Sequence, residues 1–112
     1  MQESPIFTRT FDMLVWLIPM TLKFPREQRF IMAQRVQHAA LDFYEAITAA
    51  ALSTKAGRYL EQGDIELQRL RLYLRLCHRM EFLSMAQYEH ISKMVTEIGK
   101  LLGGWHKKER GV

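Results

Sequence analysis

Residues 60–83 read LEQGDIELQRLRLYLRLCHRMEFL, and this segment carries the most information about how the chain folds and assembles. At about 100° per residue in an α-helix, its apolar side chains form two stripes on nearly opposite sides. One stripe is Leu60, Leu67, Leu70, Leu74 and Cys77, and the other is Ile65, Leu72, Leu76 and Leu83. Because a helix of a monomeric bundle needs only one apolar face, we predict that the second stripe is a subunit interface built on Ile65, Leu72 and Leu76. The alternative is that this helix is simply the most buried one.

A row of polar and basic side chains lies between the two stripes, and it consists of Gln68, Arg71, Arg75 and Arg79. Guanidinium groups along one helix edge repel one another unless an anion meets them, and arginine is well suited to phosphate. We therefore predict a ridge that binds nucleic acid or an acidic partner. The alternative is a solvated face that Asp64 and Glu61 partly neutralise.

The rest of the chain predicts three further helices. With the helix at residues 60–82, they lie at about residues 6–22, 26–51 and 85–103, and a basic tail covers residues 106–112. Pro5 and Pro25 suit first helical turns, and Ser84 with Gln87 has the pattern of a capping box. Pro19 is expected to kink or loosen the end of the first helix. Short connections between four helices predict an all-α antiparallel four-helix bundle, in one domain spanning residues 1–112.

Apolar residues spaced by three and four predict the buried face of each of these helices. The first helix carries Phe7, Phe11, Leu14 and Ile18. The second carries Phe30, Ala33, Val36, Ala40, Phe43, Ile47 and Ala50. The fourth has the most regular heptad pattern, with Tyr88, Ile91, Val95, Ile98, Leu102 and Trp105.

Composition narrows the function class. The 112 residues carry a net charge of +4, and arginine outnumbers lysine by ten to six, which modestly favours polyanionic partners. The single cysteine, Cys77, excludes an internal disulfide and fits a reducing compartment, so we expect a cytoplasmic protein. The most apolar run, at residues 13–20, is too short to span a bilayer, and we expect no membrane partner.

No catalytic constellation is visible in the sequence. His38, Asp42 and Glu45 share a helix face, but the Glu-x-x-His pairs of metal-binding bundles do not occur. The sequence also contains no phosphate-binding glycine loop, nucleophilic triad or zinc pattern. We therefore predict a binding and assembly protein that is not an enzyme and uses no metal or cofactor.

Five segments carry a resemblance to a known family. They are FDMLVWLIP at residues 11–19, KFPREQRF at 23–30, ALDFYE at 40–45, LRLYLRL at 70–76 and EIGKLLGGW at 97–105. In order and spacing they resemble the accessory variability determinant proteins of diversity-generating retroelements. That family belongs to a broader group of four-helix-bundle proteins, which includes the 23S ribosomal RNA intervening-sequence proteins.

The resemblance implies a barrel-like homopentamer that binds the reverse transcriptase and the RNA or DNA of its retroelement and supports mutagenic copying without catalysis of its own. Arg71 and Arg75 match arginine positions of the family, and Lys100 lies where a basic residue is usual on the fourth helix.

The next candidates for binding are Arg26, Arg29 and Arg35, then Lys107, Lys108 and Arg110 of the tail. The alternative is a nucleic-acid-binding or structural oligomer of the intervening-sequence group with no retroelement role.

Overall fold

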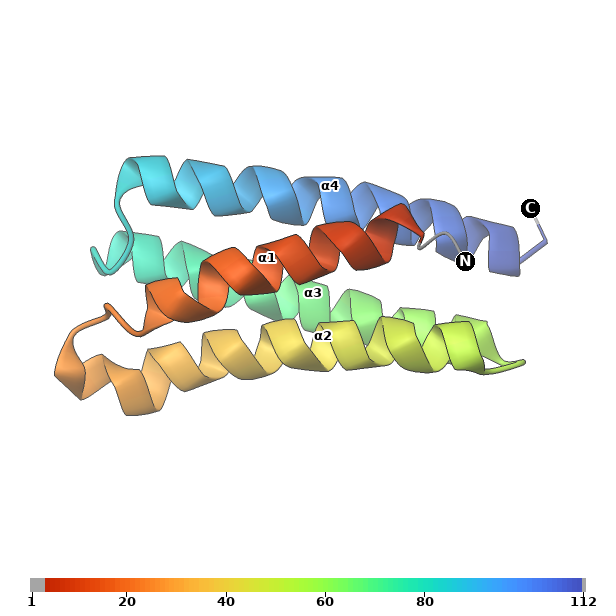
Figure 1. Ribbon diagram of the computed structural model, residues 1–112, viewed down its shortest axis with the longest axis horizontal. Helices are drawn as coiled ribbons and strands as arrows, with labels where there is room; N and C mark the ends of the chain where they lie inside the picture. Colours follow the sequence, from red (N-terminus) through yellow and green to blue (C-terminus); the bar gives the residue numbers. More distant parts are fainter. Residues whose placement is uncertain (1–3, 112) are drawn as a thin grey trace.

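The computed structural model describes residues 4–111, which form an antiparallel bundle of four long helices (Figure 1). These are α1 (Pro5–Thr21), α2 (Gln34–Leu52), α3 (Ala56–Arg79) and α4 (Met85–Glu109). A 3₁₀ turn, η1 (Arg26–Gln28), and a π-helical turn, η2 (Arg29–Ala33), lead into α2. Each helix packs against the next one in the chain, and α4 packs against α1, so α1 and α3 are diagonal neighbours. The described part of the chain contains no strand.

The turn between α3 and α4 has well-defined ends on both sides. At the end of α3 the backbone N–H of Phe82 donates to the Cys77 carbonyl at 2.8 Å, and Glu81 takes a positive φ of 65°. At the start of α4 the Ser84 hydroxyl accepts from the Gln87 N–H at 3.1 Å, and the Gln87 side chain accepts from the Ser84 N–H at 2.9 Å. The predicted capping box is therefore confirmed, and it fixes where α4 begins.

Three helix boundaries predicted from the sequence were wrong. The second helix was expected from residue 26, but α2 begins at Gln34, after the turns η1 and η2. The other two errors lie at glycines. α3 begins at Ala56 and not at residue 60, because Gly63 is buried against Phe43 of α2 inside an unbroken helix. α4 continues through Gly103 and Gly104 to Glu109, so most of the predicted basic tail is helical. In both places the packing of neighbouring side chains outweighs the low helix propensity of glycine.

The core fills the space between the four helices. The first stripe of α3 and the centre of the α4 heptad are fully buried, as the sequence predicts. Three residues are corrections: Leu83 is buried, whereas Phe11 and Phe30 are exposed. Leu83 follows the end of α3, so helical periodicity does not apply to it, and Phe30 lies in η2, where the π turn shifts the phase of the helix.

Cys77 lies in this core with no exposed surface. Burial raises the pKa of its thiol from 9.0 to about 11, because the charged thiolate is disfavoured away from water. The thiol therefore stays protonated at neutral pH. Within residues 4–111, no helix is long and apolar enough to cross a membrane.

Candidate functional site

The three arginines of the predicted ridge lie on the exposed surface of α3. Arg71, Arg75 and Arg79 are exposed, and no carboxylate of residues 4–111 forms an ion pair with any of them. Asp64 and Glu61, the expected internal partners, lie on the same helix but are not paired with them either. The observed α3 ion pair joins Arg69 to Glu66 instead. The ridge therefore keeps its positive charge.

Arg71 and Arg75 line a groove between α3 and α4, with a volume of about 260 Å³. The opposite wall comes from α4 and consists of Tyr88, Ser92, Val95 and Thr96. Arg71 reaches across to α4: a Cβ added at Gly99 would lie only 2.6 Å from the Arg71 Nη2. The glycine thus leaves room for the guanidinium group beside α4. We call this feature the arginine groove.

The arginine groove also contains an aromatic side chain that sequence reasoning missed. The Tyr88 ring stacks on the His78 ring with 4.5 Å between centroids and an interplanar angle of 6°. Tyr88 was predicted to lie in the buried heptad of α4, but it is half-buried and lines the groove. Ser92 and Thr96 were also missed as site residues, because only the packing of α3 against α4 places them beside the arginines.

A second hollow continues the arginine groove across the outer face of α4. It shares Ser92 and Thr96 with the groove and adds Lys93, Glu97 and Lys100. Glu97 pairs with Arg9 of α1, which neutralises it. Lys100, the predicted site residue on this helix, therefore lies on the same continuous surface as Arg71 and Arg75.

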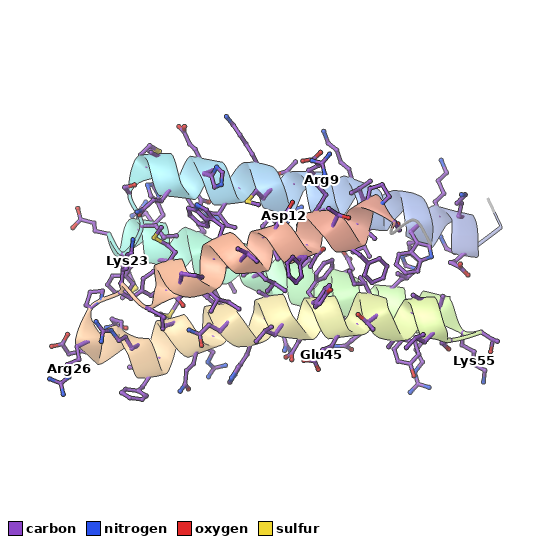
Figure 2. All side chains as sticks on the ribbon, viewed as in Figure 1. Arg9, Asp12, Lys23, Arg26, Glu45 and Lys55 are labelled. Atoms are coloured by element: carbon purple, nitrogen blue, oxygen red, sulfur yellow. The ribbon has the colours of Figure 1, made fainter. Side chains whose placement is uncertain are left out.

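The remaining predicted site residues lie elsewhere on the molecule. Arg79 is at the last turn of α3 and does not line the arginine groove. Arg26 lies at the opposite end of the bundle from Lys55 (Figure 2). Arg29, in η2, donates from Nε to the Phe24 carbonyl at 3.2 Å. Arg35 lines a separate groove between α2 and α3. The predicted set is thus divided among several surfaces.

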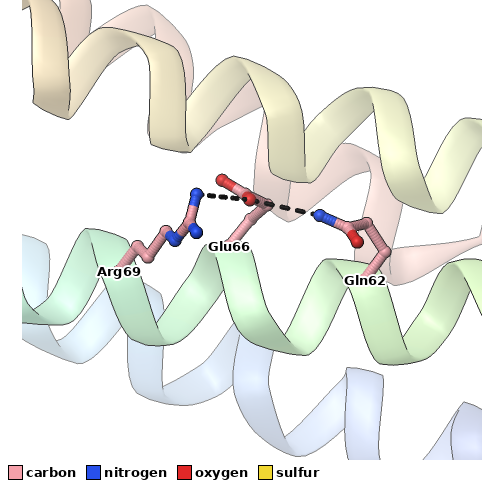
Figure 3. A network of polar contacts seen from close by, with 3 residues as sticks. All are labelled: Gln62, Glu66 and Arg69. Atoms are coloured by element: carbon pink, nitrogen blue, oxygen red, sulfur yellow. Dashed lines mark hydrogen bonds and ion pairs between the residues drawn. The ribbon is translucent and has the colours of Figure 1, made fainter.

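The groove between α2 and α3, about 230 Å³ in volume, differs in charge from the arginine groove. Its lining contains two arginines, Arg35 and Arg69, and two carboxylates, Asp42 and Glu66. Glu66 is buried, and its Oε1 accepts from the Gln62 Nε2 at 3.2 Å and from the Arg69 Nη1 at 3.3 Å (Figure 3). Because the charges balance, this groove offers little attraction to an anion.

Two apolar stripes remain exposed, on the diagonal helices α1 and α3. Ile65, Leu72 and Leu76 of α3 are 50%, 55% and 42% exposed. The stripe on α1 was not predicted and consists of Phe11, Val15 and Leu22, the last directly after the helix end. A monomer would leave both stripes in contact with water, which is unfavourable.

Comparison with known proteins gives one family and one fold. The model of the bAvd-like family matches residues 6–109. A crystal structure of a protein of unknown function from the S23 ribosomal protein family of Bacteroides thetaiotaomicron VPI-5482 superposes with a TM-score of 0.83. The two chains are 23% identical, and the match covers 91% of this chain and 98% of the other, so it shows the fold alone. No curated protein matches.

Proposed function

The chain belongs to the bAvd-like family, and we propose that it is a non-catalytic accessory protein of a diversity-generating retroelement. It binds the element's reverse transcriptase and its nucleic acid, and so supports mutagenic copying. The observation that carries the proposal is the arginine groove, whose guanidinium groups have no acidic partner within residues 4–111.

The chemistry of the arginine groove suits a phosphate backbone. Arg71 and Arg75 supply charge and forked donors, and Ser92 and Thr96 supply hydroxyl groups on the facing wall. Arginine, serine and threonine are common phosphate ligands in nucleic-acid complexes, and such contacts carry little sequence information. We therefore expect affinity that depends strongly on salt and weakly on sequence.

The two exposed apolar stripes support self-assembly. They lie on diagonal helices, so a contact between the α3 stripe of one copy and the α1 stripe of the next is heterologous, and such contacts close into rings when the rotation allows. The family resemblance favours five copies. A ring would repeat the arginine groove around its surface and increase its avidity for a long polyanion.

Assembly is tested by Leu72→Glu together with Leu76→Glu. Because both side chains are exposed, we expect the variant to lose oligomer mass in light scattering while its helical circular dichroism stays unchanged. The matched control is Leu52→Glu, which changes a leucine that is more exposed and belongs to neither stripe. A parent chain that is monomeric at micromolar concentration would contradict the assembly.

Nucleic-acid binding is tested by Arg71→Ala with Arg75→Ala, and the control is Lys55→Ala with Arg58→Ala, which removes the same charge from exposed positions outside the grooves. Losing two phosphate contacts should reduce the slope of log affinity against log salt by about 1.4 for single strands and about 1.8 for duplex DNA. The first variant should also retain less reverse transcriptase than the control. Equal slopes for the two variants would contradict the proposal.

A second candidate function is a nucleic-acid-binding or structural oligomer of the intervening-sequence group. The similarity to the S23 family structure favours it only at the level of fold. The two candidates differ in one partner, because only the retroelement protein needs to bind a reverse transcriptase. Co-purification of this chain with a retroelement reverse transcriptase therefore separates them.

A further inference from the structure

A large hollow is lined by residues from the start of α1 and the end of α4. These helix ends lie at the far end of the bundle from the α3–α4 turn (Figure 1). Its volume is about 680 Å³, within the range of roughly 300–1,000 Å³ that is usual for small-molecule sites. Phe7, Leu101 and Trp105 supply apolar surface, and Lys100 and Lys108 supply charge. We call this feature the aromatic pocket.

The aromatic side chains of this pocket hold one another in place. Phe7 and Trp105 have ring centroids 6.1 Å apart, and Phe7 also makes an edge contact with Tyr44 at 6.4 Å. The Trp105 Nε1 also donates to a carboxylate oxygen of Glu109, one turn further along α4, at 3.4 Å. Trp105 is nevertheless only half-buried. A rigid indole with surface left open is a ready platform for stacking a flat ring.

The packing of the molecule does not account for the glycine pair beside Trp105. Gly103 and Gly104 lie inside α4, and a Cβ added at either would meet no atom within 4 Å. Glycine is the least favourable residue in a helix apart from proline. Of the two, only Gly104 lines the aromatic pocket, where the missing side chain keeps the wall open.

The charged side chains that line the pocket are both positive, and the Glu109 carboxylate lies beside it, bonded to the Trp105 Nε1. Lys100 and Lys108 line it, and no aspartate or glutamate of residues 4–111 does. Lys100 also lines the hollow that continues the arginine groove, so one positive surface runs across α4 from Arg71 to the indole. Five residues of α4 lie along this path, each four positions after the one before: Ser92, Thr96, Lys100, Gly104 and Lys108. Because four residues turn about 40° more than one full helical turn, the path runs obliquely around the helix axis.

We propose that the aromatic pocket holds an unpaired base of a single-stranded nucleic acid whose phosphates follow this path to the arginine groove. The inference rests on the proposed function and makes it more specific. Bases have a flat face that stacks on an indole, and their phosphates match the lysines at the rim. A base inside a duplex is already stacked on both faces and cannot enter. The protein therefore prefers single strands or flipped-out nucleotides.

The test compares Gly104→Leu with Gly103→Leu, using single-stranded oligouridine and a blunt RNA duplex with the same number of phosphates. Both changes replace glycine by a better helix former, so both variants should melt at or above the parent's temperature. Only Gly104→Leu fills the pocket. Its affinity for oligouridine should fall roughly 5- to 100-fold, the range that loss of base stacking gives, while duplex binding stays unchanged. Gly103→Leu should bind both ligands as the parent does.

A second pair of variants does not touch the helix interior. Lys108→Ala should weaken oligouridine binding several-fold more than Lys107→Ala, although both remove one exposed lysine from the same turn. Stacking is read directly in a Trp16→Phe background, where Trp105 is the remaining tryptophan. Its fluorescence should be quenched by oligouridine and not by the duplex.

The outcomes separate this proposal from the proposed function. If Gly104→Leu binds oligouridine as tightly as the parent, the pocket holds no base, and nucleic-acid binding through the arginine groove stands. If Gly104→Leu loses the reverse transcriptase but not oligouridine, the pocket belongs to a protein partner and the proposal is wrong. If the parent binds neither nucleic acid, both proposals are wrong.

Discussion

The two grooves that flank α3 contain equal numbers of arginines and differ in what faces them. Between α2 and α3, Arg35 and Arg69 lie with two carboxylates. Between α3 and α4, Arg71 and Arg75 face the hydroxyl-bearing side chains Ser92 and Thr96 and a tyrosine. The difference shows that the charges on one helix do not define a binding surface. The neighbouring helix decides whether those charges are neutralised inside the protein or remain available to an anion.

The largest expected effect comes from reversing one charge in each groove. Arg75→Glu should weaken nucleic-acid binding roughly thirtyfold or more, because it removes a charge-assisted hydrogen bond and repels the phosphate. Arg35→Glu makes the same change in net charge in the groove between α2 and α3. It should weaken nucleic-acid binding by about threefold or less, because it acts through long-range electrostatics alone. Fluorescence anisotropy at fixed salt measures both. Equal losses would mean that net charge, and not the arginine groove, determines affinity.

Removing a negative charge from the groove between α2 and α3 should make it more like the arginine groove. Glu66→Gln keeps an oxygen that can accept from Gln62 and Arg69 but removes the buried negative charge. The free energy of unfolding should fall by about 1 kcal/mol, because charged hydrogen bonds become neutral ones. Nonspecific binding should rise by about two- to threefold. Glu61→Gln, an exposed carboxylate on the same helix, is the control and should change neither urea denaturation nor binding measurably.

Gly99→Ala is a smaller change at the wall of the arginine groove. The new methyl group would overlap the Arg71 Nη2, so the end of this flexible side chain must move off α4. We expect affinity to fall by about two- to fivefold, as one phosphate contact is weakened. Stability should rise by up to about 1 kcal/mol, since alanine is the better helix former. Gly103→Ala, whose methyl group meets no atom, should raise stability in thermal melts and leave binding unchanged.

The smallest effect on the grooves is expected from the α3–α4 turn. Ser84→Ala removes the hydroxyl of the capping box and should lower the free energy of unfolding by about 1 kcal/mol. The core holds α4 against α3 along its whole length, so nucleic-acid affinity should stay within about a factor of two. A larger loss of affinity would show that the geometry of the arginine groove is set at the turn.

Much of the fold could be predicted from the sequence, because the core follows helical spacing. The centre of α4, from Ile91 to Leu102, is buried as its heptad pattern indicates. One burial error, Phe11, lies on a regular helix, whose buried face is instead formed by Ile6, Met13, Leu14 and Leu17. The other two occur where helical spacing no longer holds. Leu83 lies beyond the end of α3, and Phe30 lies in a π-helical turn that no spacing rule anticipates. Gly103 and Gly104 are inside α4 because Leu102 and Trp105 pack against the core on either side of them.

The candidate site was less predictable, because it is made by two helices. Arg71 and Arg75 could be found from α3 alone, since they share one edge of it. Ser92 and Thr96 have no local signal, and neither does the role of Gly99 as the surface on which Arg71 lies. Arg35, also predicted as a binding residue, lines the groove between α2 and α3, where Asp42 of its own helix and Glu66 of α3 lie in the same lining.

The buried thiol of Cys77 affects how any assembly of this chain should be interpreted. A protonated sulfur without exposed surface reacts with oxidants or alkylating reagents only after α3 separates from the core, so its modification rate measures the opening of the bundle. Covalent dimers linked through this residue would require the same opening. Oligomers that form from the folded chain are therefore held together without disulfides, and they should dissociate on dilution alike under oxidising and reducing conditions.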